Sequence, residues 1–208
     1  MKKLALVPFL IIALVSSSGC GLIKRQEEED KGLTAAGLAN NTFEAGNEVG
    51  VKNLALGLDL AQSFTSTTLA TLNFVELTML KVNSPGAATI TVTIEGDAND
   101  APNNVPMGGA SAIRTVADLS ATHAVVRFNF SGTVQLAANV KYWLRVTISS
   151  GPQPSTGALV KWAGSQNNPY PRGGAKYQLA TFAWTDVLQA GTGFSGPNHD
   201  FVFRLGRQ

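Results

Sequence analysis

The residues best suited to chemistry in this sequence are aromatic and lie close together in its C-terminal third. Four of the six Trp and Tyr residues fall within the 23 positions from 162 to 184: Trp162, Tyr170, Tyr177 and Trp184. Amide and cationic side chains stand among them, namely Asn168, Arg172 and Lys176. Flat apolar rings beside hydrogen-bond donors suit a sugar ring, which needs both stacking and oriented hydrogen bonds. The segment therefore predicts a glycan-binding surface, with burial of the rings in a hydrophobic core as the alternative.

A second group of residues could hold a cation. Asp97, Asn99 and Asp100 lie in an oxygen-rich stretch that continues to Asn103 and Asn104. Ca²⁺ takes roughly six to eight oxygen ligands, so such a loop can bind it. The spacing lacks the glycine and the final glutamate of an EF-hand loop. Because Asp and Asn also favour turns, a turn without calcium is the preferred interpretation.

Enzyme motifs are scarce. The sequence has no G-x-S-x-G elbow, no H-E-x-x-H motif and no Gly-rich phosphate loop, and its two histidines are His123 and His199. Ser195, His199 and Asp200 have the residue types of a hydrolytic triad. Adjacent residues of a strand point to opposite faces, however, so His199 and Asp200 could not share one site. We therefore expect no catalysis, and a hydrolase is the least favoured hypothesis.

The N-terminus reads as an export signal. Two lysines precede an apolar run over residues 4–15, and small residues follow up to Cys20. This order defines a secretory signal, and the run is shorter than the ~20 residues of a membrane span. Residues 16–20 resemble a lipobox, although Ser17 stands where an apolar residue is usual. We expect cleavage after residue 19 and acylation of Cys20, the sole cysteine.

Acyl chains on Cys20 would hold the protein on a lipid bilayer, since each buried methylene contributes about 0.8 kcal/mol. Gly21 follows, and by resemblance to lipoproteins of two-membrane bacteria the lack of Asp there favours the outer membrane. Residues 24–31 are charged without an apolar face, which is typical of a solvated tether. The predicted organisation is a lipoprotein signal peptide over residues 1–19, a lipidated cysteine with a flexible charged tether over residues 20–41, and one domain over residues 42–208.

Charge and cysteine content limit what this domain can be. Removing the first 19 of 208 residues leaves 189 and takes away two of the 16 basic residues, so 14 basic and 14 acidic residues remain. A neutral chain without a basic cluster lacks the electrostatic footprint of a nucleic-acid-binding protein. The domain contains no cysteine, so neither a disulfide nor a cysteine metal site can stabilise it.

Alternation with a period of two predicts several strands. It occurs over residues 89–95, 124–130, 142–148 and 201–205. Residues 74–82 are apolar on both faces, with Val75, Leu77 and Met79 as the inner set. The 142–148 pattern places Trp143 outward, as a candidate contact surface, and a short helix is conceivable over residues 112–120. Short strands separated by turn-forming residues indicate an all-β, antiparallel sandwich or barrel.

From residue 62 onward, the order of features resembles a known domain family. It runs through Gln62-Ser63-Phe64-Thr65, a strand pair at 72–82 and 89–95, an Asp/Asn/Pro/Gly loop at 96–109, Phe128-Asn129-Phe130, Val134-Gln135-Leu136, Val140-Lys141-Tyr142-Trp143-Leu144, Trp162, Asn168-Pro169-Tyr170, Gly173-Gly174-Ala175-Lys176-Tyr177, Trp184 and Asp200-Phe201-Val202-Phe203-Arg204. Over roughly residues 43–208 the chain is similar to bacterial extracellular jelly-roll domains of the choice-of-anchor kind. The resemblance implies a non-catalytic jelly-roll β-sandwich, related in shape to carbohydrate-binding modules, in a family with no settled ligand.

These features together predict a cell-envelope lipoprotein that binds without catalysis. Glycan is the favoured ligand class, and the alternative is a structural or protein-interaction subunit of an envelope assembly, which would use a sheet face or a strand edge. Solvent-exposed, coplanar rings of Trp162, Tyr170 and Tyr177 would favour glycan. Rings buried in the core, beside a broad apolar outer patch, would favour a protein partner.

Overall fold

The computed structural model describes residues 39–40, 49–51, 58–82, 88–148, 159–165, 170, 173–187 and 200–206. The predicted signal peptide, Cys20 and the charged stretch over residues 24–31 lie outside the described residues, as do Asn168 and Arg172. Within the described ranges, no helix is long and apolar enough to cross a membrane.

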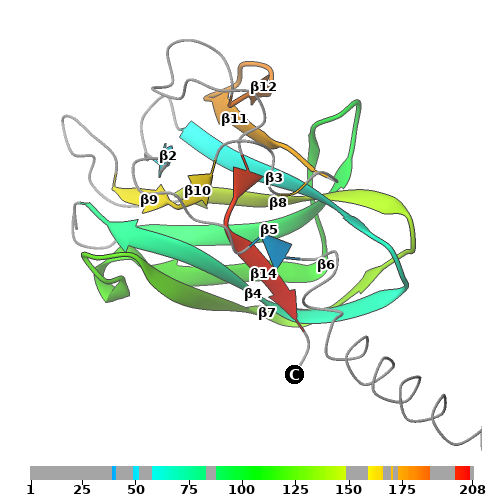
Figure 1. Ribbon diagram of the computed structural model, residues 1–208, viewed down its shortest axis with the longest axis horizontal. Helices are drawn as coiled ribbons and strands as arrows, with labels where there is room; N and C mark the ends of the chain where they lie inside the picture. Colours follow the sequence, from blue (N-terminus) through cyan, green and yellow to red (C-terminus); the bar gives the residue numbers. More distant parts are fainter. Residues whose placement is uncertain are drawn as a thin grey trace, which may run out of the picture.

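Two antiparallel sheets form the described chain (Figure 1). The first sheet has the strand order β12-β11-β3-β8-β5-β6. Its strands are β12 (Thr185–Asp186), β11 (Ala175–Leu179), β3 (Leu58–Ser66), β8 (Val140–Ile148), β5 (Thr89–Asp97) and β6 (Pro102–Thr115). Strands β3, β8 and β5 form its centre, so side chains on its outer face come from segments far apart in the sequence.

The second sheet is built around one long strand, β4 (Ala70–Lys81), which pairs with β7 (Ala124–Leu136) along one edge. Along its other edge lie β14 (Phe203–Gly206) and β9 (Val160–Trp162). Two short strands complete this sheet: β1 (Ala39–Asn40) pairs with β14, and β2 (Val49–Val51) pairs with β9. A separate short pair joins β10 (Gly164–Ser165) to β13 (Asp200–Phe201).

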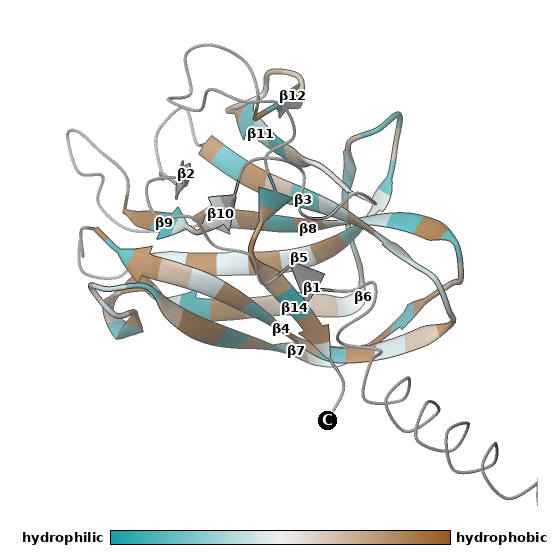
Figure 2. Cartoon of the chain, in the orientation of Figure 1, coloured by the Kyte–Doolittle hydropathy of each residue, from teal (hydrophilic) through white to brown (hydrophobic). Residues whose placement is uncertain are grey.

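The hydrophobic core lies between the two sheets and follows the predicted alternation. Val75, Leu77 and Met79 are buried on β4 as expected. Figure 2 shows the resulting bands of apolar and polar residues along the strands. Phe64 of the first sheet and Phe203 of the second lie with their ring centres 6.1 Å apart, which joins the two inner faces. The predicted all-β antiparallel sandwich is confirmed, whereas its jelly-roll connectivity stays a prediction.

Two local expectations were wrong. The polar stretch over residues 96–109 is not one loop, because β6 begins at Pro102 and pairs with β5 across two register shifts. The conceivable helix over residues 112–120 is instead the end of β6 followed by the short 3₁₀ helix η1 (Val116–Asp118).

Candidate functional site

The aromatic residues singled out by the sequence do not form one exposed surface. Trp162 is fully buried, because β9 turns its side chain into the core. Its ring stacks on Phe201 with centres 4.3 Å apart, and its indole N–H donates to the Val202 carbonyl oxygen at 2.8 Å. Tyr170 is buried edge-on against Phe203. An exposed glycan-stacking role is therefore wrong for Trp162 and Tyr170, which serve as core residues.

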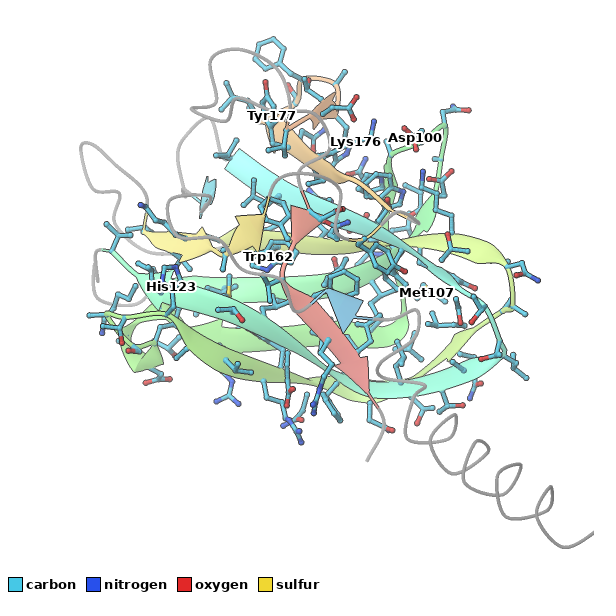
Figure 3. All side chains as sticks on the ribbon, viewed as in Figure 1. Asp100, Met107, His123, Trp162, Lys176 and Tyr177 are labelled. Atoms are coloured by element: carbon cyan, nitrogen blue, oxygen red, sulfur yellow. The ribbon has the colours of Figure 1, made fainter. Side chains whose placement is uncertain are left out.

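The other two rings of that segment lie nearer the surface and on different faces. Tyr177 on β11 is partly buried and packs against the core. Trp184 precedes β12 and is half-buried, with its ring centre 5.5 Å from the Arg145 guanidinium. Figure 3 shows Trp162 between the sheets and Tyr177 at the β11–β12 end of the molecule. The predicted cluster is thus divided between the interior and the outer face of the first sheet.

Trp143 marks that outer face. It faces away from the core, as predicted, between its cross-strand neighbours Ser63 and Glu95. The expectation that it forms an exposed contact surface was wrong, since only 1% of it is accessible. Its indole N–H donates to Asp97 at 2.7 Å, and the ammonium group of Lys141 lies 5.1 Å from the ring centre. A buried indole on the outer face shows that other residues cover the sheet here.

A pocket of about 340 Å³ lies beside this indole. Its lining comes from β3, β8, β11, β12 and the β5–β6 connection: Ser63, Asp100, Lys141, Trp143, Gly173, Gly174, Lys176 and Asp186. We call it the outer-face pocket. Two hydrogen bonds join Ser63 to Gly174. The Gly174 N–H donates to Ser63 Oγ at 2.9 Å, and the Ser63 N–H donates to the Gly174 carbonyl oxygen at 3.0 Å. Backbone pairing therefore fixes one wall of the pocket.

Ion pairs fix the opposite wall. The Asp100 carboxylate accepts a hydrogen bond from Lys141 and forms an ion pair with Lys176 at 3.1 Å. The Lys176 ammonium group also lies 2.9 Å from the Asp186 carboxylate. Figure 3 shows Lys176 and Asp100 side by side. Burial disfavours the charged form of Asp100, but the hydrogen bonds and charges of the two lysines outweigh it and lower its pKa. Burial likewise opposes charge on Lys176, yet its two aspartate partners raise its pKa.

The calcium hypothesis for Asp97, Asn99 and Asp100 gains no support from this geometry. Lys141 and Lys176 pair with the Asp100 carboxylate, and the Trp143 indole N–H donates to that of Asp97. The two ammonium groups would also repel a cation. Asn99 and Asp100 have φ values of 54° and 61°, and the Ala98 N–H donates to the Ala101 carbonyl oxygen at 2.8 Å. These are the marks of a tight hairpin turn, which is the preferred interpretation of the sequence. In the described ranges, no group of three or more His, Cys, Asp or Glu side chains is placed to hold a metal ion.

A second polar cluster adjoins Trp143 on the same face. The Arg145 guanidinium donates two hydrogen bonds to Asp59, at 2.6 and 3.2 Å, one to Glu95 at 3.3 Å and one to Asn104 at 2.9 Å. Within the part of the chain that the structure describes, Glu95 Oε2 and the Trp184 indole nitrogen are buried without a hydrogen-bond partner. Buried polar atoms are normally satisfied, so these two atoms are exceptions.

Part of this face could have been read from the sequence. Lys141, Trp143 and Arg145 alternate along β8, and Glu95 and Asp97 alternate at the end of β5, each with a spacing of two. Such a spacing places charged and aromatic residues on one strand face. Only Trp143, Asp97, Asp100, Lys176 and Trp184 of this face were predicted as site or contact residues.

Asp200 belongs to a buried hydrogen-bond network inside the sandwich. Its carboxylate accepts hydrogen bonds from Gln62 Nε2 at 2.8 Å and from the Tyr170 N–H at 3.0 Å, while Gln62 Oε1 accepts from the Phe201 N–H at 2.7 Å. Burial raises the pKa of Asp200 to about 6, although these hydrogen bonds partly oppose the rise. Asp200 therefore connects β3 to β13 and to Tyr170, and being fully buried it cannot reach a substrate.

We expect Asp200→Asn to change how stability depends on pH. At pH 4.5 the folded carboxyl group is mostly protonated and the unfolded one, with a pKa near ~3.9, is mostly ionised, so low pH favours folding. This contribution is lost as the pH rises through about 6. The variant is destabilised at both pH values, because its amide NH₂ faces a donor. Urea unfolding should show a wild-type advantage about 2 kcal/mol larger at pH 4.5 than at pH 7.5. An equal advantage at both values would contradict the raised pKa.

No protein-family model matches the chain, and no curated protein matches it. The fold and the outer-face pocket therefore define it as a two-sheet antiparallel β-sandwich with a polar pocket on the outer face of one sheet.

Proposed function

We propose that this chain is a lipid-anchored lipoprotein of the cell envelope whose jelly-roll domain binds glycan without catalysis. The ligand would enter the outer-face pocket and extend toward the Arg145 cluster. The observation that carries the proposal is the composition of this face: ammonium, carboxylate, amide and hydroxyl groups surround one indole on a rigid sheet. Such groups offer both donors and acceptors to sugar hydroxyls.

Preorganisation supports a binding role. Lys176 is held between Asp100 and Asp186, and Arg145 between Asp59 and Glu95, so their side chains lose little freedom when a ligand binds. Fixing polar groups before binding reduces the entropic cost of association.

The two carboxyl groups with shifted pKa values favour binding over catalysis. A general acid must hold its proton near neutral pH, and the two lysines lower the pKa of Asp100 instead. Asp200 has a raised pKa, but it is buried in the sandwich, away from solvent. Neither carboxyl group is suited to protonate a glycosidic oxygen, which is the first requirement of glycoside hydrolysis.

A protein-interaction subunit is the second candidate function. The β11–β12 hairpin displays Phe182 with 65% of its surface exposed and Leu179 with 37% exposed. Exposed aromatic residues are frequent anchors of protein interfaces. A protein interface was expected to show a broad apolar patch, and two exposed residues on one hairpin are less than that. The polar pocket therefore favours glycan binding over a protein interface.

The test of glycan binding is an array probed with the full-length protein in detergent, with Lys176→Gln as the pocket variant. A glycan that binds the wild type should bind Lys176→Gln about tenfold more weakly, because the ligand loses a hydrogen bond to the mostly buried ammonium group. Lys81→Gln is the matched control, since Lys81 lies on the second sheet and donates to the Ala117 carbonyl oxygen. Absence of binding anywhere on the array would refute the glycan proposal. Equal binding by both variants would refute the outer-face pocket as the binding site.

The anchor has an independent test. Cells grown with a clickable fatty acid should label the wild-type protein and leave Cys20→Ser unlabelled, because the chain has one thiol to carry the lipid. Fractionation should then place the labelled protein with the outer membrane. Persistent labelling of Cys20→Ser would refute the assignment.

A further inference from the structure

Two ammonium groups of the outer-face pocket converge on one carboxylate. Asp100 Oδ1 accepts from Lys141, and Asp100 Oδ2 lies 3.1 Å from the Lys176 Nζ atom. The same two ammonium groups lie over Trp143, at 5.1 and 6.0 Å from the ring centre. Asp100 therefore occupies a position in which the carboxylate of a ligand could pair with the same two lysines.

The exposed fractions of the ion-paired side chains show which of these side chains a ligand can displace. The Lys176 side chain is 12% exposed and that of Lys141 34%, whereas those of Asp100 and Asp186 are 63% and 58% exposed. The lysines thus belong to the pocket wall, and the aspartates stand at its rim. A ligand arriving from solvent can displace a rim carboxylate far more readily than a wall ammonium group.

The position of Asp100 on the chain allows this displacement. It lies in the turn between β5 and β6, which is closed by the Ala98 N–H to Ala101 hydrogen bond. Rotating its side chain away breaks no strand pairing. Exposed ion pairs contribute only about 0–1 kcal/mol each, so an external carboxylate can compete with Asp100.

We propose that Lys141 and Lys176 form an anion subsite for the carboxylate of an acidic glycan, and that Asp100 occupies this subsite when no ligand is bound. The choice of ligand rests on the proposed glycan function, whereas the anion subsite does not. Asp100 acts as an internal competitor, so the affinity for acidic sugars is lower than the two lysines alone would give.

The experiment compares trigalacturonate with its fully methyl-esterified form, which is the same sugar without charge, in calorimetric titrations of the full-length protein. Asp100→Asn should bind trigalacturonate about five- to tenfold more tightly than the wild type, because an internal competitor worth one or two exposed ion pairs is removed. Its affinity for the ester should not rise, because the ester has no carboxylate to take the place of that of Asp100. Asparagine tolerates the positive φ at this position, so the turn should persist.

Controls separate the subsite from general charge effects. Asp118→Asn makes the same change at an exposed site on η1, beyond the opposite end of β6, and should leave trigalacturonate affinity unchanged. Lys141→Gln should weaken trigalacturonate binding by about tenfold and ester binding by less, because the ester has no carboxylate to pair with the ammonium group.

The outcomes distinguish this proposal from the proposed function. Glycan binding on the array, together with equal or weaker trigalacturonate binding by Asp100→Asn, would overturn the subsite and leave glycan binding intact. Absence of glycan binding, together with tighter binding of inorganic sulfate by Asp100→Asn, would support the subsite and refute the glycan function. If neither protein binds trigalacturonate or sulfate, the subsite is overturned.

Discussion

Replacing Trp162 with alanine should lower the free energy of unfolding by about 3–5 kcal/mol, the range for a large aromatic residue removed from a core. Its side chain is fully buried, it stacks on Phe201, and its indole N–H donates to the Val202 carbonyl oxygen. The variant leaves a cavity and an unpartnered carbonyl oxygen together. Urea unfolding monitored by circular dichroism measures the loss.

Trp184→Ala is the control, because the same residue type is removed from a half-buried position. We expect it to cost about 1 kcal/mol. Equal losses in the two variants would contradict the placement of Trp162 in the core. The result also bears on ligand tests, since a Trp162 variant that loses binding would report unfolding rather than contact with a sugar.

Gly173→Ala should destabilise the protein by about 2–4 kcal/mol through overpacking. A Cβ atom at Gly173 would lie far inside contact distance of the Ser63 carbonyl oxygen and 2.8 Å from Tyr170 Cδ1. Backbone cannot move aside as a flexible side chain can, so the 173–174 segment would have to separate from β3. Thermal unfolding should show a clear fall in Tm.

Gly174→Ala provides a control one residue away. Nothing lies within 4 Å of a Cβ atom at Gly174, so this variant should keep the wild-type Tm to within a few degrees. Because the 173–174 segment lines the outer-face pocket, its displacement in Gly173→Ala should also abolish ligand binding. Equal stability of the two variants would show that the 173–174 segment does not pack on Ser63 as described.

The strands were predictable because burial imposes a period of two. Val75, Leu77 and Met79 point inward as their pattern requires, and Trp143 faces away from the core. Burial of aromatic residues was less predictable. Trp162 lies on a strand of three residues, β9, which is too short for alternation to show which face is inner.

The outer-face pocket depends on pairings that no local pattern contains. Lys176 meets Asp100 because β11 pairs with β3, β3 with β8, and β8 with β5, whose end leads into the Asp100 turn. The sequence places Lys176 near Trp184 and Asp100 near Asn104, in two separate candidate sites. The fold brings the two together over Trp143, and this converts a candidate calcium loop into one wall of a pocket that contains lysine.

If ligand binds on the outer face of the first sheet, the three tryptophans should report it in one measurement. Each indole N–H gives its own signal in a two-dimensional NMR spectrum of the isotope-labelled protein. Titration with a glycan selected on the array should shift the signals of Trp143 and Trp184, beside the pocket and the Arg145 cluster, and leave that of Trp162 in place. A shift confined to Trp162, or no shift at Trp143 and Trp184 under saturating ligand, would contradict the account.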